Sequence, residues 1–257
     1  MNKILHSKIL GEGKPLIILH GLFGMLDNWQ AIAKEFACFF ETHIIDMRNH
    51  GRSFHANQHN YELMSEDLIS YLNDYNLDDV YLIGHSMGGK VAMTFACMYP
   101  ESVEKLVVVD IAPKYYPPHH QEILSALNAV EQAKIKSRKD ADQILSKYIS
   151  ESTMRQFLLK NLYWKSSTEL TFKFNLKVLS NQIENVGQAL HISALFENPT
   201  LFIVGQASNY IKKTDIELIE SHFPDFEIVE IPESGHWVHA ESPVQFFDKV
   251  SRFLIYY

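Results

Sequence analysis

The order of apolar and amphipathic segments in this sequence predicts an α/β protein, with a mostly parallel central sheet and helices on both of its faces. Short apolar runs alternate with segments whose apolar residues recur at helical spacing. Parallel strands that are buried on both faces need apolar side chains throughout, and long crossover connections must join them. The alternation stops over residues 113–198 and then resumes, which indicates one sheet domain with an insertion.

Six apolar runs outside this insertion are expected to be strands. They span residues 15–19, 42–46, 80–83, 106–109, 200–204 and 226–231. The segments between and after them show helical spacing of their apolar residues. The expected helices span residues 26–36, 61–72, 87–99, 215–221 and 244–254. Right-handed crossovers between successive parallel strands would distribute these helices over both faces of the sheet.

Residues 113–198 contain no convincing strand pattern, and we expect them to be helical. The expected helices span residues 121–136, 140–149, 153–164 and 176–190. Because this stretch leaves from the carboxyl end of the strand that ends at Asp110, it should lie over the sheet edge where such folds bind ligands. We therefore interpret 113–198 as a helical cap on a core formed by 1–112 and 199–257. The alternative is a helical layer without a role at the site.

Composition and charge narrow the classes of protein that this sequence can encode. Of its 257 residues, 46% are hydrophobic and 21% are charged, as in ordinary globular proteins, and the net charge is −8. No nucleic-acid partner is expected, because nucleic acids bind basic surfaces. The two cysteines, Cys38 and Cys97, have neither disulfide-framework nor metal-site spacing. No apolar run reaches membrane-span length and no signal-peptide core is recognised, so we expect a cytoplasmic location and leave the oligomeric state open.

A G-x-S-x-G motif lies at the junction between a predicted strand and a predicted helix. Residues 84–88 (GHSMG) follow the apolar run 80–83 and open the helix that begins at Met87. A sharp turn at this point raises the serine hydroxyl out of the sheet, and the helix N-terminus offers unpaired N–H groups to a developing anion. In this context the motif is typical of the α/β-hydrolase fold, and we predict Ser86 as the nucleophile. The alternative is a glycine-rich turn that only begins a helix.

A serine hydroxyl is a weak nucleophile, so it needs a general base within hydrogen-bond reach. His236 lies between the last predicted strand and the last predicted helix, at the same sheet edge as Ser86. The histidine comes last in the chain order of this fold, which makes His236 the predicted base. His239 follows three residues later, but no third ligand has suitable spacing, so we do not expect a metal site.

The acid that orients the histidine is less obvious from the sequence. In most relatives of this topology it follows the strand predicted at 200–204, but the next residues, 205–210 (GQASNY), contain no carboxylate. Asp110 ends the preceding strand at the same edge and can hold the imidazole of His236 in the required tautomer. We favour Asp110 over Asp215, which we expect to be the N-cap of the following helix.

Two backbone N–H groups should stabilise the oxyanion of the reaction. One is that of Met87, directly after the nucleophile. The second should come from residues 20–24 (HGLFG), after the first long apolar strand. We choose Leu22 and keep Phe23 as the alternative. The polar residues 46–53 (DMRNHGRS) are expected to form a hydrogen-bonded brace rather than to take part in the chemistry.

Several of these motifs together resemble the YbfF-type bacterial esterases and their mitochondrial relatives in animals. The motifs are 20–24 (HGLFG), 46–53 (DMRNHGRS), 84–89 (GHSMGG), 110–113 (DIAP) and 235–240 (GHWVHA). The resemblance runs over nearly the whole chain, most loosely in the cap. In that family the acid also follows the earlier strand, which supports Asp110. The resemblance implies hydrolysis of acyl esters, with acyl-CoA thioesters as a further substrate class and no cofactor.

The resemblance also suggests that Tyr116, Tyr210 and Trp237 line the substrate pocket, and we expect Phe23 to contribute to it. Taken alone, each of these aromatic residues fits core or cap packing equally well. Three cationic or titratable residues near the cap entrance, Lys114, His119 and His120, could meet an anionic leaving group, although a solvated surface is the simpler interpretation.

The predicted reaction is hydrolysis of a small acyl ester or thioester through an acyl-enzyme on Ser86. The same residues could instead serve carbon–carbon hydrolysis, perhydrolysis or acyl transfer. Dehalogenation is disfavoured, because it needs a carboxylate nucleophile where Ser86 stands. A ligand-binding module that keeps the fold without turnover is the alternative from another class.

Overall fold

The central sheet has seven strands in the order β1-β3-β2-β4-β5-β8-β9. The computed structural model describes residues 4–118 and 120–257. The strands are β1 (Ser7–Leu10), β2 (Pro15–Leu19), β3 (Glu41–Ile45), β4 (Val80–His85), β5 (Val103–Val109), β8 (Thr200–Gly205) and β9 (Phe226–Ile231). All neighbouring pairs are parallel except β1 and β3, which are antiparallel. The predicted, mostly parallel sheet is therefore confirmed.

The edge strand β1 has no counterpart among the predicted strands. It is only four residues long, and its side chains are partly or fully exposed. An edge strand of this kind needs no continuous apolar run, so the criterion that identifies the inner strands does not detect it.

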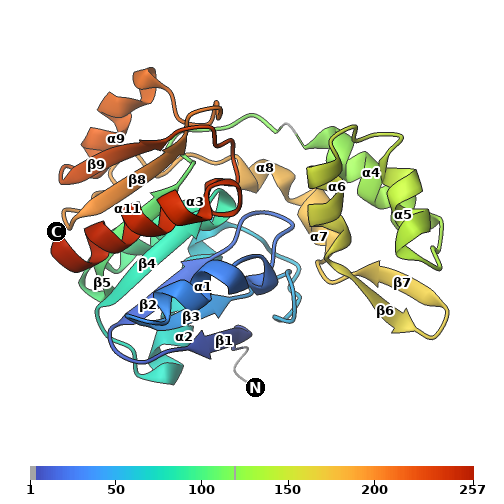
Figure 1. Cartoon of the computed structure of the whole chain (residues 1–257), viewed down its shortest axis with the longest axis horizontal. Helices are drawn as coiled ribbons and strands as arrows, with labels where there is room; N and C mark the ends of the chain where they lie inside the picture. Colours follow the sequence, from blue (N-terminus) through green and yellow to red (C-terminus); the bar gives the residue numbers. More distant parts are fainter. Residues whose placement is uncertain (1–3, 119) are drawn as a thin grey trace.

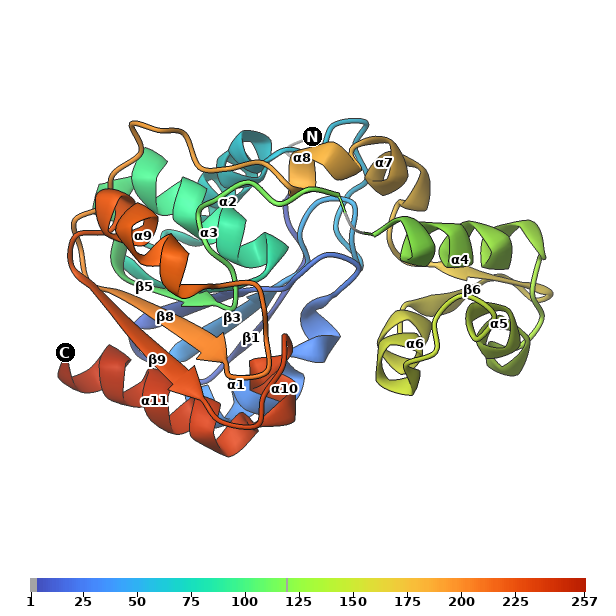
Figure 2. The same ribbon diagram turned by 90° about the horizontal axis from the view of Figure 1, so that it is seen from above.

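Helices cover both faces of the sheet (Figures 1 and 2). On one face lie α2 (Tyr61–Tyr75), α3 (Met87–Met98) and α9 (Ile216–His222). On the other lie α1 (Gln30–Phe36), α10 (Val238–Glu241) and α11 (Pro243–Tyr256). Successive side chains of a strand point to opposite faces. In β4, Leu82 packs into the cluster with α2 and α3, whereas its neighbour Ile83 packs into the cluster with α1 and α11.

The segment predicted as the cap, residues 113–198, lies largely beside the sheet, at the carboxyl ends of the strands (Figure 1). Its helices are α4 (Gln121–Gln132), α5 (Arg138–Leu145), α6 (Ser152–Leu159), α7 (Leu176–Asn181) and α8 (Ile183–Val186). It also contains an antiparallel hairpin of β6 (Leu162–Ser166) and β7 (Glu169–Phe172), so the prediction that this segment lacks strands is wrong.

The local sequence explains the hairpin. The helix predicted over 153–164 ends at Leu159, and α7 and α8 divide the helix predicted over 176–190. In β7 the burial alternates with a period of two: Leu170 and Phe172 are buried, whereas Glu169 and Thr171 are half-exposed. The buried Leu162 of β6 follows Leu158 and Leu159 of α6 at the spacing of apolar residues in a helix. The sequence pattern therefore predicts a helix that continues past its true end.

Two linkers join the cap to the core, residues 113–118 and 186–190, and they run side by side. The Tyr116 N–H donates to the Gly187 carbonyl at 2.8 Å, and the Leu190 N–H donates to the Pro113 carbonyl at 2.8 Å. A Cβ on Gly187 would lie 2.1 Å from the Tyr116 carbonyl oxygen, so the contact requires glycine. Within the described parts of the chain, no helix combines the length and the apolar composition needed to cross a membrane.

Candidate active site

Ser86 lies on the turn between β4 and α3, in a backbone conformation that only a constrained site imposes on serine. Its φ is 54° and its ψ is −118°, a region in which side-chain-bearing residues are uncommon. The Ser86 N–H donates to the Val109 carbonyl at 3.1 Å, which ties the turn to the end of β5. The serine side chain is thereby held at the carboxyl edge of the sheet.

The two glycines of the motif are required by close backbone approach. A Cβ on Gly84 would lie 2.2 Å from the Gly88 carbonyl oxygen. A Cβ on Gly88 would lie 2.5 Å from the carbonyl oxygen of Leu19, the last residue of β2. The G-x-S-x-G spacing therefore reflects how tightly the turn packs against itself and against the neighbouring strand.

The structure brings His236 and Asp110 together. His236 Nδ1 lies 2.8 Å from Asp110 Oδ2, and the carboxylate is fully buried. The carboxylate also accepts hydrogen bonds from the Gly205 N–H, at 3.1 Å, and from the Ser208 hydroxyl. Because a carboxylate only accepts, Nδ1 of His236 carries a proton and Nε2 is left as the basic nitrogen of the neutral ring. The turn after β8 thus supplies a hydroxyl that orients Asp110, in place of a carboxylate.

Aromatic and imidazole rings surround His236. The Tyr210 ring stacks on it, with centroids 3.9 Å apart. His85 Nε2 donates to the His236 carbonyl at 2.8 Å, and burial together with the neighbouring imidazoles holds the pKa of His85 well below its usual range. His239 stacks on Trp29 with centroids 3.8 Å apart, and burial lowers the pKa of His239 to about 3. Sequence reasoning missed the support from His85, whose only signal is its position beside Ser86.

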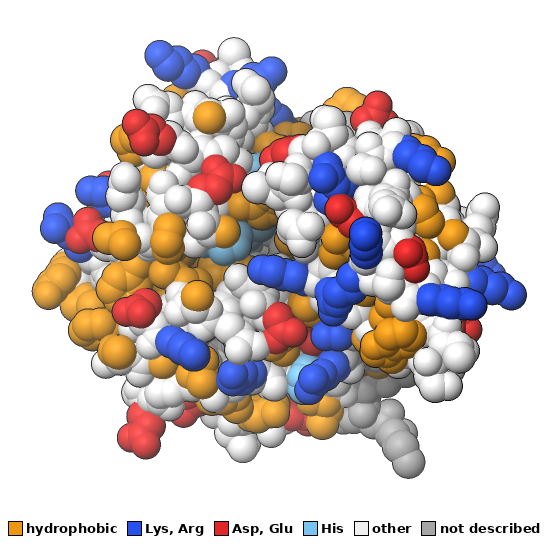
Figure 3. Space-filling model, turned by 45° about the vertical axis from the view of Figure 1, so that its right-hand side comes forward, with side chains coloured by type: hydrophobic (Ala, Val, Ile, Leu, Met, Phe, Trp, Pro, Cys, Tyr) orange, Lys and Arg blue, Asp and Glu red, His pale blue; other side chains and the backbone are white. Residues whose placement is uncertain are grey.

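Ser86 and His236 line one cavity of about 210 Å³ between the core and the cap. Within the described residues their side chains make no direct hydrogen bond, and such contacts are often long in ligand-free enzymes. Phe23, Tyr210 and Trp237, predicted as pocket residues, line this cavity. The cap contributes His120, Ile123, Met154 and Phe157. Figure 3 shows the depression between the two parts, with hydrophobic and histidine side chains at its floor.

Tyr116, the fourth predicted pocket residue, lines a smaller neighbouring cavity together with Tyr210 and Lys90. Its hydroxyl donates to the Tyr210 carbonyl at 2.6 Å and accepts from the Ala112 N–H at 2.9 Å. Burial raises the pKa of Tyr116 above its ordinary value. The hydroxyl therefore joins the cap linker to the loop that carries Tyr210.

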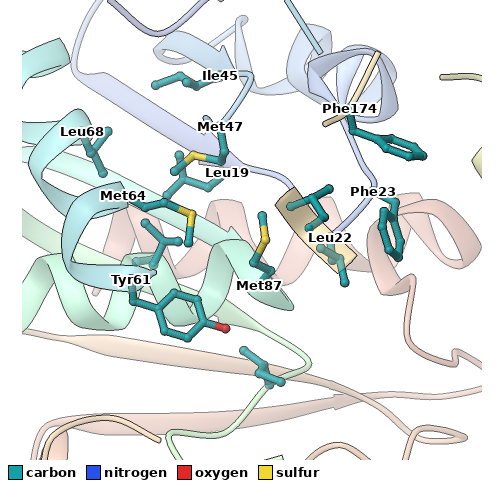
Figure 4. Packing of buried hydrophobic residues seen from close by; sticks show 14 of the residues in the cluster. Leu19, Leu22, Phe23, Ile45, Met47, Tyr61, Met64, Leu68, Met87 and Phe174 are labelled. Carbon is teal, nitrogen blue, oxygen red and sulfur yellow. The ribbon is translucent and has the colours of Figure 1, made fainter. Parts of the chain in front are cut away.

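The backbone at the predicted oxyanion hole distinguishes its two candidate donors. The Phe23 N–H donates to His50 Nε2 at 3.2 Å, so it is already engaged. The N–H groups of Leu22 and Met87 have no hydrogen-bond acceptor within residues 4–118 and 120–257. Figure 4 shows the Leu22 and Met87 side chains in the same buried cluster, with Phe23 beside Phe174. The geometry favours Leu22 over Phe23 as the partner of Met87.

The stretch 46–53 forms contacts that agree with the predicted brace. Asp46 accepts from the backbone N–H groups of Leu26, at 2.7 Å, and Arg52, at 2.8 Å. Arg48 Nη2 donates to Asp67 Oδ1 of α2 at 2.7 Å. These contacts join the loop after β3 to both the oxyanion loop region and the helix layer.

Asp215 is engaged away from His236. Its carboxylate forms an ion pair with Lys114 and accepts from the Lys212 N–H at 2.8 Å. As predicted, it occupies the N-cap position of α9, although its side chain makes no hydrogen bond to that helix. His119, predicted near the cap entrance, lies outside the described residues.

Comparison with known proteins places the chain in a family. A family model described as alpha/beta hydrolase fold matches residues 14–243. The esterase YbfF of Escherichia coli is 35% identical, covering 95% of this chain and 94% of that protein. An sn-1-specific diacylglycerol lipase of Danio rerio is 38% identical, covering 95% of this chain and 79% of that protein. A solved structure of a marine microorganism esterase is 42% identical, with a TM-score of 0.95, covering 98% of this chain and 100% of that one. The chain belongs to the α/β-hydrolase family and is a hydrolase.

Proposed function

We propose that the protein is a serine esterase that hydrolyses small carboxylic esters through an acyl-enzyme on Ser86. The observation that carries this proposal is the 2.8 Å contact between His236 Nδ1 and the buried Asp110 carboxylate, at the cavity that Ser86 lines. The esterases and lipases among its relatives support the same class of reaction.

In the proposed mechanism, Ser86 Oγ attacks the acyl carbon while His236 Nε2 takes its proton. The carbonyl oxygen becomes an oxyanion that accepts hydrogen bonds from the N–H groups of Leu22 and Met87. The buried carboxylate of Asp110 stabilises the imidazolium, which returns the proton to the leaving alcohol. Water then attacks the acyl-enzyme with the same base, and the carboxylic acid leaves.

The cavity favours short acyl chains. Its volume of about 210 Å³ is below the roughly 300–1,000 Å³ of pockets that hold drug-sized ligands. The cap side of the cavity is mainly apolar, with Ile123, Met154 and Phe157 in its lining. Acyl-CoA thioesters would react by the same chemistry, but Lys114, a cation predicted near the entrance, is paired with Asp215. We therefore propose esters ahead of thioesters.

A substrate panel with a nucleophile variant tests this function. We expect kcat/KM to be highest for p-nitrophenyl acetate or butyrate and lower for a long-chain ester or for acetyl-CoA and decanoyl-CoA. Ser86→Ala should lose several orders of magnitude in kcat, because the acyl-enzyme cannot form. Ser193→Ala, at an exposed serine between α8 and β8, is the matched control and should behave like the wild type.

Labelling by a fluorophosphonate probe separates the enzyme from a non-catalytic binding module. The probe should react rapidly with the wild type and with Ser193→Ala, but not with Ser86→Ala. Full activity in Ser86→Ala would show that another residue is the nucleophile. A wild-type protein that neither hydrolyses the panel nor takes the label would instead favour the binding module.

A further inference from the structure

The oxyanion loop, residues 20–24, depends on contacts that hold its peptide planes. Leu22 N–H and Gly21 C=O belong to one planar peptide unit and point in opposite directions. The Gly21 carbonyl accepts the Gly24 N–H at 3.0 Å, and His20 Nδ1 lies 2.8 Å from it. Because these two contacts fix the Gly21 carbonyl, they also fix the direction of the Leu22 N–H on the other side of the same peptide unit. The next residue, Phe23, has a φ of 58°, a conformation that is uncommon for a bulky side chain.

Two buried side chains hold Phe23 in this conformation, one on each of its peptide groups. His50 Nε2, from the core, accepts the Phe23 N–H at 3.2 Å. Asn161 Nδ2, from the cap, donates to the Phe23 carbonyl at 2.8 Å. His50 Nδ1 lies 3.0 Å from the Arg48 carbonyl, which keeps the proton on Nδ1 and leaves Nε2 as an acceptor. Both side chains are fully buried.

Asn161 is itself fixed at the base of the cap hairpin. Its carbonyl accepts the Lys173 N–H at 2.9 Å, from the residue that follows β7. Its side-chain oxygen, Oδ1, is buried and has no hydrogen-bond partner among the described residues. Leaving such an acceptor unpaired is unfavourable. The favourable side-chain hydrogen bond of Asn161 is therefore the one that its Nδ2 group donates to the Phe23 carbonyl.

We propose that Asn161 is a positioning residue through which the seated cap fixes the oxyanion loop. Its amide holds the Phe23 carbonyl. Together with the contact of His50 to the Phe23 N–H, it fixes the backbone of the residue after Leu22 and so keeps the Leu22 N–H directed at the developing oxyanion. The oxyanion loop thus depends on a contact that the cap supplies, and turnover depends on that contact. This inference rests on the proposed esterase function.

Two variants of Asn161 and one matched control test this role. Asn161→Leu and the nearly isosteric Asn161→Asp both remove the N–H donor to Phe23. Asn185→Leu is the control, because Asn185 Nδ2 also donates from the cap to a core carbonyl, that of His59 at 3.1 Å, away from the oxyanion loop. The measurements are kcat and KM for p-nitrophenyl butyrate and the Ki of a trifluoromethyl ketone, which forms a tetrahedral oxyanion on Ser86.

We expect kcat to fall roughly 10- to 100-fold in both Asn161 variants with little change in KM. Removing an oxyanion donor outright costs about 100- to 1,000-fold in kcat, and a displaced donor should cost less. The affinity for the trifluoromethyl ketone should weaken by about the same factor as kcat/KM, whereas a loss of packing alone would act mainly on KM. Asn185→Leu should keep the wild-type kcat and Ki.

Two outcomes would overturn the inference. One is wild-type kcat and Ki in the Asn161 variants, and the other is an equal loss in Asn185→Leu, which would reduce the effect to general cap anchoring. If Asn161→Leu does not fold, Asn161→Asp carries the same comparison. Failure of the proposed function would be a separate result. It would be seen as absent hydrolysis in the wild type, or as full hydrolysis in Ser86→Ala, without any change at Asn161.

Discussion

At the scale of single residues, the proposed acid comes from one strand earlier than the turn after β8. Asp110 directly follows β5, and Ser208 donates its hydroxyl to the same carboxylate oxygen that contacts His236. On the turn after β8, a serine hydroxyl thus stands where most relatives carry the carboxylate. The negatively charged carboxylate instead comes from Asp110, after β5. This arrangement makes the identity of the acid testable by comparing two aspartates.

Asp110→Asn should lower kcat by about four orders of magnitude, because an amide that donates to Nδ1 favours the wrong tautomer of His236. Asp215→Asn, which loses only the ion pair with Lys114, should stay near the wild-type rate. Steady-state hydrolysis of p-nitrophenyl butyrate checks both variants. The opposite ranking would assign the acid to Asp215.

His59 makes a separate residue-level prediction about stability in acid. It is fully buried, neither ring nitrogen has a hydrogen-bond partner among the described residues, and burial is the main cause that lowers its pKa to about 3. Its ordinary pKa is 6.5, so between pH 6.5 and about 3 the unfolded chain binds a proton that the folded chain does not. This difference lowers the free energy of unfolding as the pH falls through that window.

His59→Phe should therefore lose less stability than the wild type on acidification. Between about pH 7 and about pH 5, the wild type should lose about 2 kcal/mol more of its free energy of unfolding than the variant does, because each pH unit below the ordinary pKa contributes about 1.4 kcal/mol. Denaturant unfolding at the two pH values measures it. The exposed His191 provides the control, and His191→Gln should keep the wild-type slope. Parallel slopes for wild type and His59→Phe would contradict the prediction.

At the scale of elements, α3 carries more than the nucleophile. Lys90 lies one turn after Ser86 and is almost fully buried. Its Nζ donates to the Lys114 carbonyl and, at 2.9 Å, to the Gln188 carbonyl, one on each cap linker. Tyr61 of α2 donates its hydroxyl to the Val186 carbonyl. Two helices of this sheet face, α2 and α3, thus hold both linkers of the cap.

Lys90→Met should increase amide hydrogen exchange in the linkers, at Tyr116 and Leu190, because it removes the donor shared by both. Burial lowers the pKa of Lys90 to about 7, below its ordinary 10.5, so the unfolded chain binds a proton that the folded chain does not, and the free energy of unfolding decreases as the pH falls from 10.5 toward 7. The variant removes this charge, and we expect no loss of global stability. Exchange measured by mass spectrometry reads the local effect.

Lys105→Met is the matched control for the linkers. Lys105 is also buried and donates to backbone carbonyls, among them that of Leu254 at 2.9 Å, at the end of α11. Its replacement should leave exchange in the linkers unchanged. Equal exchange at Tyr116 and Leu190 in the wild type and Lys90→Met would show that the linkers hold each other without the lysine.

The elements differ in how far the sequence could predict them. The buried strands and the elbow were predictable, because continuous apolar runs and the glycines around Ser86 are local signals. The hairpin of β6 and β7 was not, since Leu162 continues the helical spacing of α6. The edge strand β1 carries no apolar run, so only its pairing with β3 identifies it.

At the scale of the whole molecule, the candidate site draws on residues that are distant in the sequence. Ser86 and His236 could be predicted from their positions at one sheet edge. The contact between Asn161 and Phe23 joins residues 138 positions apart, and no motif marks either partner for it. The tautomer of His50 likewise depends on a carbonyl and an N–H that only the folded loops bring together. Local patterns thus predict the reacting groups, whereas the supporting contacts require the tertiary structure.

The adjacent linkers have a consequence for how such a chain can diversify. The entropy cost of closing a loop rises only slowly with its length when its ends are already close together. Pro113 and Leu190 are hydrogen-bonded neighbours, so the segment between them can be lengthened, shortened or exchanged with little effect on the sheet. An insertion at this point is therefore a route by which evolution can alter the shape of the pocket while Ser86, His236 and Asp110, which the core carries, stay in place.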